Sequence, residues 1–246
     1  MRFHLESLFS MIIFLHLTLF VGCSNKDTTP PELKNLGVSF GDTFSGGVLG
    51  DFDFTNTTGA CAGTLSNCDC ASNERIFFEF GYLEGSKYLP TFEYRVLENT
   101  NVLTPIDGII DAVDFQGSTS DYAIRIKPNE DSTWGVEMDH VLSPLVSKND
   151  SVRAGDIIGK PGTWSSLLNQ GRVELMLYNG STAYCPFDYF APSIKDYYKN
   201  SVTQFMSLWE SASCKNDQNI YPQGAMHHPG CLCRTMSTSG EGGCIE

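Results

Sequence analysis

The stretch from Val102 to Tyr178 constrains the fold most, because it contains several short runs in which apolar and polar residues alternate. The clearest runs are Asp121–Lys127, Trp134–Val141 and Arg172–Tyr178. Successive side chains of a β-strand point to opposite faces, so each run predicts a strand with one buried face and one wet face. Together they predict a mainly β fold built on an antiparallel sheet or sandwich.

One helix and two cysteine-containing flanks are expected around this centre. Apolar residues recur at helical spacing between Ser193 and Ser211, which predicts an amphipathic helix packed on the core. The segment before the strands and the tail after the helix are rich in turn-forming residues and cysteine. The expected organisation is a signal peptide (1–22), a tether (23–32), a disulfide-pinned β segment (33–90), a β domain (91–190), and a helix with a Cys-rich tail (191–246).

The first residues are typical of an export signal. Arg2 precedes an apolar run from Leu8 to Val21, which is too short to favour a membrane span. Its end, Leu19-Phe20-Val21-Gly22-Cys23, resembles the lipobox of bacterial lipoproteins, although Phe20 stands where leucine is usual. The resemblance implies lipidation at Cys23 and export to the bacterial cell envelope, on the outer membrane or the periplasmic face. The alternative is an ordinary signal peptide followed by an unrelated cysteine.

The remaining eight cysteines predict up to four disulfides, because an exported chain meets an oxidising environment. They are Cys61, Cys68, Cys70, Cys185, Cys214, Cys231, Cys233 and Cys244. The alternative is a zinc site using Cys68-x-Cys70, Cys231-x-Cys233 and the pair His227-His228. A one-residue spacing between cysteines is poor for such a site, so disulfides are favoured. His227 and His228 are expected to be surface residues.

The net charge excludes one class of partner. Removal of the signal takes away one acid and one base, which leaves 28 acids and 15 bases and a net charge of 15 − 28 = −13. Such an acidic chain does not favour nucleic acid or another anionic polymer as a ligand. It is compatible with cationic partners and with solubility.

Two similar turns carry a resemblance to a known family. Thr104-Pro105-Ile106-Asp107-Gly108 and Val152-Arg153-Ala154-Gly155-Asp156 each precede an apolar run, and Asp139-His140-Val141 lies between them. This order resembles the lysostaphin-like zinc peptidases, the M23 family, with their duplicated hybrid motif. The resemblance covers roughly Glu93 to Phe190. It implies an antiparallel β sandwich or barrel-sandwich hybrid, here with one C-terminal helix and disulfide-rich flanks.

The same resemblance implies that the metal ligands have changed. The family binds zinc through the His and Asp of a His-x3-Asp motif and through the second His of His-x-His. These positions correspond here to Leu89, Glu93 and Glu174, while the first His of His-x-His becomes Arg172. Leucine cannot bind a metal, and a fixed guanidinium charge would repel one. No metal or other cofactor is therefore expected; if one binds, the ligands would be Glu93, Glu174 and His140.

The expected function follows from the loss of the family's metal ligands. His140 keeps the position of the family's non-ligand catalytic histidine, but is more simply explained as a strand histidine hydrogen-bonded to Asp139 or a neighbouring carboxylate. A non-catalytic envelope protein, binding a peptide or a cell-wall glycan or serving a structural role, is the leading hypothesis. Its groove residues would be Glu93, Asp139, His140, Arg172 and Glu174. The alternatives are an active zinc peptidase cleaving cell-wall peptide bridges, and a host-contact or structural lipoprotein without a functional groove.

Overall fold

The computed structural model describes residues 26–54, 75–165, 169–211 and 219–245. The expected signal peptide, Cys23, Cys61, Cys68, Cys70 and Cys214 lie outside these ranges. None of the helices in the described ranges has the length and apolar character needed to cross a bilayer.

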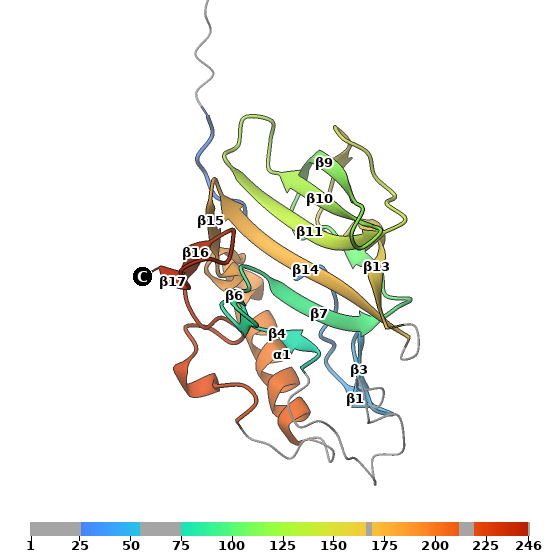
Figure 1. The fold of residues 1–246 in the computed structure, drawn as a ribbon, viewed down its shortest axis with the longest axis vertical. Coiled ribbons are helices and arrows are strands. Elements are labelled where there is room, and N and C mark those ends of the chain that lie inside the picture. Colours follow the sequence, from blue (N-terminus) through green and yellow to red (C-terminus); the bar gives the residue numbers. More distant parts are fainter. Residues whose placement is uncertain (1–25, 55–74, 166–168, 212–218, 246) are drawn as a thin grey trace, which may run out of the picture.

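A large antiparallel sheet forms the centre of the molecule (Figure 1). Five long strands run side by side in the order β9 (Gly108–Gln116), β10 (Asp121–Lys127), β11 (Trp134–Leu142), β14 (Gln170–Asn179) and β7 (Phe92–Leu97). The other members of the sheet are β4 (Phe77–Phe78), β8 (Val102–Leu103), β12 (Ser151–Val152), β13 (Ile157–Ser165), β15 (Thr182–Tyr184), β16 (Thr235–Ser237) and β17 (Cys244–Ile245). The three runs predicted as strands are thus strands, and the fold is mainly β with antiparallel pairing.

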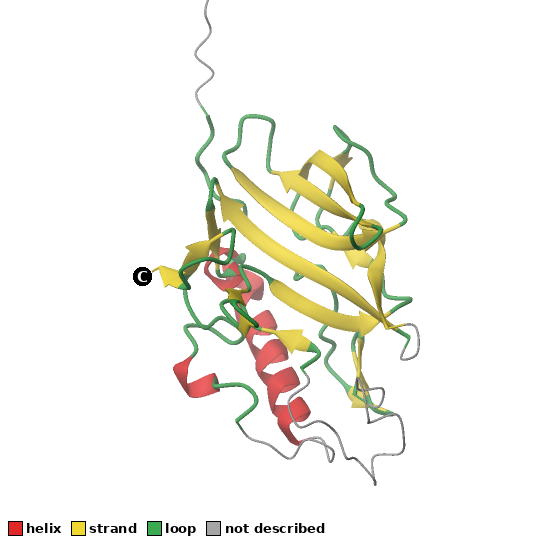
Figure 2. Ribbon diagram, in the orientation of Figure 1, coloured by secondary structure: helices red, strands yellow, loops and turns green. Residues whose placement is uncertain are grey.

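Smaller elements flank the sheet. They are the three-stranded sheet of β1 (Phe44–Ser45), β2 (Val48–Leu49) and β3 (Phe52–Asp53), the hairpin of β5 (Leu83–Glu84) and β6 (Lys87–Tyr88), and the 3-10 turns η1 (Pro186–Tyr189) and η2 (Gln223–Ala225). The one α-helix of the described ranges, α1 (Pro192–Ser211), begins one residue before the predicted start, because proline suits the first turn of a helix. It lies beside the β4 and β7 end of the sheet (Figure 2).

The two turns that carry the family resemblance interlock. The Ala154 N–H donates a 2.8 Å hydrogen bond to Asp107 Oδ1, and the Gly155 N–H donates one of 2.8 Å to the Thr104 carbonyl. Gly155 has a φ of +93°, a conformation that side-chain-bearing residues rarely adopt. The turns therefore fix each other and the strands that follow them.

Apolar side chains from one face of the sheet form the core. Alternate residues of β11 and β14 are fully or almost fully buried: Trp134, Val136, Met138, Val173, Leu175 and Leu177. At the β7 end, aromatic rings join the sheet to α1 and to β3, in a cluster of Phe40, Phe52, Phe54, Phe77, Tyr94, Phe205 and Trp209. The opposite face of the sheet is polar, and we call it the polar face.

One expectation about the flanks needs correction, and the expectation of disulfides is confirmed for two bonds. The described part of the expected tether is attached to the body: the Asp27 N–H donates to the Asp131 carbonyl at 3.0 Å, and Pro31 is buried. Local polarity predicted a free segment, but the segment's partners come from the distant β10–β11 loop. In the tail, Cys185 is bonded to Cys231 and Cys233 to Cys244. Cys231 and Cys233 therefore cannot serve as zinc thiolates.

Candidate functional site

Charged side chains lie in two rows across three neighbouring strands of the polar face. In the first row Glu174 of β14 pairs with Asp139 of β11 on one side and with Glu93 of β7 on the other. In the second row Arg172 pairs with Arg95. Directly opposed residues within each row carry like charges, and the acids of the first row meet the bases of the second between the rows. The sequence predicted four of these residues as neighbours, and the structure brings them together.

The Arg172 guanidinium occupies the space between two of the carboxylates. Its Nη2 lies 3.0 Å from Glu93 Oε2 and forms a close ion pair with Glu174 Oε1. Thr91 Oγ1 donates a 2.9 Å hydrogen bond to the other oxygen of Glu174. Glu93 has no exposed surface, and Glu174 is 8% exposed. Buried carboxylates require such compensation, and here Arg172 supplies it from within the chain.

The β7 end of this arrangement is covered. Arg95 forms an ion pair with Glu93, and its guanidinium carbon lies 3.5 Å from the centre of the Trp164 ring and 5.0 Å from that of Phe78. Arg95 is 2% exposed as a result. An aromatic face attracts a guanidinium, so these rings hold the base over its carboxylate. Neither charge of this pair is open to a ligand from solvent.

A bulge in β11 brings two consecutive residues to the same face. Tyr122 pairs with Val141 and Ile124 with Met138, so two residues of β11 lie opposite one residue of β10. The extra residue is His140, with a φ of +59°. Simple alternation would direct Asp139 and His140 to opposite faces, whereas a bulge changes the direction of a side chain. Both residues therefore belong to the polar face.

The His140 ring is held by three carboxylates. Its Nδ1 lies 2.8 Å from Asp121 Oδ2, and its Nε2 lies 3.4 Å from Glu174 Oε1 and 4.0 Å from Asp139 Oδ2. A Cβ atom on Gly162 would lie 2.8 Å from Asp121 Oδ2, so this approach depends on a glycine in β13. The expected hydrogen bonding of His140 to a neighbouring carboxylate is thus present, with Asp121 as the closest partner. We use the name charged cluster for Glu93, Arg95, Asp121, Asp139, His140, Arg172 and Glu174.

The pKa values of the cluster respond to burial and to these contacts. Burial by itself lowers the pKa of His140, but Glu174 and Asp139 outweigh it, so the pKa is raised above 6.5. Burial raises the pKa of Glu174, but contact with His140 and Arg172 outweighs it, and the net shift is downward. For Asp139 burial prevails and the pKa is raised. The adjacent Glu137, buried beside Asp139, has its pKa raised to about 7.

The residues at the family's ligand positions do not fit a zinc ion. Leu89 offers no ligand atom, and Glu93 and Glu174 are bridged by a fixed cation, Arg172. A second group within the cluster, Asp121, Asp139 and His140, has ligand atoms within 4.8 Å of one another. In that group, however, His140 Nδ1 already contacts Asp121, and the set contains one imidazole only. Zinc sites in proteins favour several nitrogen or sulfur ligands.

The sequence analysis missed three residues that contact the predicted site residues. Arg95 lies two residues after Glu93, and this i,i+2 spacing could have placed both on one face of a strand. Thr91 precedes Glu93 by the same spacing. Asp121 gave no local signal, because it reaches His140 only through the pairing of β10 with β11.

Two depressions open elsewhere on the polar face. One of about 510 Å³ is lined by Asp111, Ala112, Val113, Asp114, Arg125, Val146, Ser147 and Lys148. The other, of about 530 Å³, is lined by Lys26, Asp111, Arg125, Lys127, Glu130, Asp131, Ser132, Thr133, Tyr178, Asn179 and Gly180. Asp111 and Arg125 belong to both. Charges of both signs line these depressions, which suits a polar ligand.

Comparison with known proteins finds likeness at the level of structure. No protein-family model matches the sequence, and a search of curated proteins finds no relative. Among solved structures, lysostaphin aligns with 49% of this chain and 45% of its own, at 16% identity and a TM-score of 0.36. The chain therefore spans less than half of lysostaphin.

Two further neighbours are peptidases. The catalytic domain of EnpA, a prophage-encoded M23 protein from Enterococcus faecalis, aligns over 44% of this chain and 80% of its own, at 19% identity and a TM-score of 0.35. A zinc-containing peptidase from Vibrio cholerae aligns over 46% and 35%, at 14% identity and a TM-score of 0.35. The structural neighbours thus include lysostaphin-like peptidase domains, at low identity and over about half of the chain.

Proposed function

We propose that this chain is an exported lipoprotein, anchored to the bacterial cell envelope through Cys23, with a peptidase-like domain that no longer performs metal chemistry. Its polar face serves as a binding surface for a peptide or a cell-wall glycan. The alternating charges of this face and its two depressions would recognise a ligand with both donors and acceptors. The lipid would hold the domain at a membrane surface.

The contact of Arg172 with Glu93 and Glu174 carries this proposal. A hydrolytic zinc site needs protein ligands around the metal and an open position where water becomes the nucleophile. Here the carboxylates at the ligand positions are neutralised by the guanidinium of Arg172. This group is part of the chain, stays charged, and cannot take up a proton. The pair at Arg95 and Glu93 is also closed to solvent by Trp164 and Phe78.

An active metallopeptidase is the second candidate, because Asp121, Asp139 and His140 form a group that could hold a metal ion. In that case zinc would bind in a His140-dependent way. Hydrolysis of cell-wall peptide bridges would then stop in His140→Ala.

One assay, applied to the purified mature protein and to a variant, separates these candidates. Cross-linked peptidoglycan is incubated with the protein and with His140→Ala, and the released fragments are quantified. We expect release no greater than in a protein-free control for either protein. If the native protein released fragments in a metal-dependent way and His140→Ala did not, the peptidase would be established instead.

Binding is tested by sedimentation with insoluble peptidoglycan. Arg125→Glu reverses a charge shared by both depressions, and Lys34→Glu is its control, because each residue belongs to one exposed ion pair. Arg125→Glu should reduce the bound fraction several-fold, while Lys34→Glu should leave it unchanged. Equal binding by both variants, or no binding by the native protein, would contradict a ligand of this kind on the polar face.

A further inference from the structure

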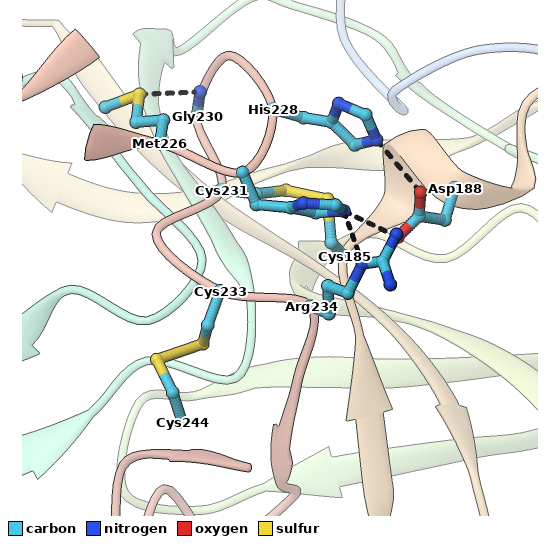
Figure 3. The surroundings of a disulfide bond; sticks show 10 residues. Cys185, Asp188, Met226, His228, Gly230, Cys231, Cys233, Arg234 and Cys244 are labelled. Atoms are coloured by element: carbon cyan, nitrogen blue, oxygen red, sulfur yellow. Dashed lines mark hydrogen bonds and ion pairs between the residues drawn. A yellow bond between two sulfur atoms is a disulfide. The ribbon is translucent and has the colours of Figure 1, made fainter. Parts of the chain in front are cut away.

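A second group of potential metal ligands is formed by η1 and the loop after η2 (Figure 3). Asp188 comes from η1, and His227 and His228 come from the loop after η2. His227 Nε2 lies 3.0 Å from Asp188 Oδ2, and His228 Nε2 lies 2.9 Å from Asp188 Oδ1. Both imidazoles thus direct the same ring nitrogen at one carboxylate. The sequence predicted surface histidines, but both are half-buried.

A disulfide and a tight loop hold these three side chains in place. Cys185, three residues before Asp188, is bonded to Cys231, three residues after His228. The loop is closed by hydrogen bonds from the His227 N–H to the Cys231 carbonyl at 2.9 Å and from the Cys231 N–H to the His228 carbonyl at 2.8 Å. The two segments that carry the potential ligands are therefore covalently joined, so little further ordering is needed for a metal to bind.

Two neighbours make opposite demands on Nε2 of His227. Its Nε2 lies 3.0 Å from a carboxylate oxygen of Asp188, which requires a proton on the nitrogen. The same nitrogen lies 3.1 Å from Nε of Arg234, a donor that requires a lone pair on it. One nitrogen cannot satisfy both neighbours. A metal ion between His227 and Asp188 would bind the lone pair of the imidazole and the charge of the carboxylate, and Arg234 would then have to turn away from His227.

We propose that Asp188, His227 and His228 form a zinc-binding site. Two imidazole nitrogens and one carboxylate oxygen are a ligand set that suits Zn²⁺, and three protein ligands leave one position for water. Atoms bound to one tetrahedral zinc ion lie about 3.3 Å apart, given bonds of about 2.0–2.1 Å. The three ligand atoms here lie within 4.8 Å of one another, so small side-chain rotations suffice.

Arg234 is the group that opposes the metal, because its guanidinium stands beside His227. Its side chain is exposed and can turn into solvent when a cation binds. Removing this charge should therefore strengthen binding. The proposal does not depend on the function of the polar face, since the two sites share no residue.

Zinc titration of the mature protein, with its disulfides intact and after treatment with a chelator, tests the site. Competition against a chromophoric chelator should show one Zn²⁺ per chain. His227→Ala, His228→Ala and Asp188→Asn should each weaken binding at least tenfold, the scale of losses seen when metal sites are altered. Arg234→Gln should tighten binding, and Asp196→Asn, at an exposed position of α1, is the matched control that should leave it unchanged.

Spectroscopy separates the loss of a metal ligand from misfolding of the variant. Co²⁺ bound at this site should give visible absorption, and Asp188→Asn, which preserves side-chain shape, should alter it. Near-ultraviolet circular dichroism of the metal-free variants should match that of the native protein. The proposal would be overturned if His227→Ala and His228→Ala bound zinc as tightly as the native protein. Zinc lost only in His140→Ala would overturn it too, and would in addition contradict the proposed loss of metal chemistry on the polar face.

Discussion

At the scale of single residues, Arg172 determines how the charged cluster behaves. Its guanidinium touches two carboxylates that are almost completely buried, and the ends of those carboxylates are partnered by Arg95 and Thr91. Taking charges out of water is costly, and the arrangement persists because each charge finds an opposite charge or a hydrogen bond. Removal of one member should therefore leave another uncompensated.

Arg172→Met is the sharpest test of this dependence. Loss of the guanidinium leaves Glu93 and Glu174 buried beside each other, so the free energy of unfolding should fall by about 3–5 kcal/mol. Urea unfolding measures the change. Arg125→Met, which breaks an exposed pair with Asp114, should cost no more than about 1 kcal/mol. Similar losses in both variants would mean that the buried pairing has no special weight.

Glu137 gives the pH dependence a definite sign. Burial and the charge of Asp139 raise its pKa in the folded protein from 4.5 to about 7. The folded state therefore holds a proton more tightly than the unfolded state. Its favourable contribution is complete below pH 4.5 and is lost as the pH rises through about 7.

Glu137→Gln should remove this part of the pH dependence. The variant should be more stable than the native protein at pH 8 by about 1–3 kcal/mol, a range that allows for solvent screening of a half-buried group. At pH 4 the two proteins should differ little. Urea unfolding at both pH values provides the comparison, and an equal difference at the two values would show that Glu137 titrates normally.

At the scale of elements, the bulge in β11 turns an ordinary strand into a site. It adds His140 to the face that already carries Asp139 and brings it opposite Asp121. The cost is a left-handed backbone conformation, with a φ of +59°, at a residue that is not glycine.

A comparison of His140→Gly with His140→Ala measures this cost. Both variants lose the imidazole and its contacts, but only glycine adopts a positive φ without strain. His140→Gly should be the more stable of the two by about 0.5–1 kcal/mol, since glycine's greater freedom in the unfolded chain offsets part of the gain. Thermal unfolding of the two variants measures the difference in stability. A more stable alanine variant would show that the bulge carries no strain.

The strands and the helix show which features the sequence could predict. Alternation identified β10, β11 and β14, and the spacing of apolar residues identified α1 almost to the residue, because these patterns are local. The bulge itself could not be foreseen, since it appears only when β11 is paired with β10. The Asp121 contact and the meeting of Asp188 with His227 and His228 depend likewise on pairing or on the disulfide between distant segments.

At the scale of the whole molecule, three regions are joined around one sheet. The polar face carries the charged cluster, the apolar face packs with the aromatic cluster and α1, and disulfides stabilise the tail. The loop closed by Cys185 and Cys231 spans 46 residues and includes all of α1. The proposed lipid anchor also belongs to this scale.

Cys23→Ala tests the anchor. In cells that produce the full chain, the native protein should be recovered with membranes and the variant in the soluble fraction, because the lipid needs the thiol. Fractionation followed by immunoblotting measures the distribution, and a cysteine variant elsewhere, such as Cys244→Ala, controls for an effect of thiol loss. Persistent membrane association of Cys23→Ala would rule out lipid as the anchor.

The attachment of Asp27 to the β10–β11 loop has a consequence for orientation. Asp27 follows Cys23 by only four positions, and an extended chain advances by at most about 3.6 Å per residue. A lipid on Cys23 would therefore leave the loop at Asp131 within about 14 Å of the headgroups. So short a tether would keep this edge of the domain next to the bilayer, and its ligands would have to reach it in the layer closest to the membrane.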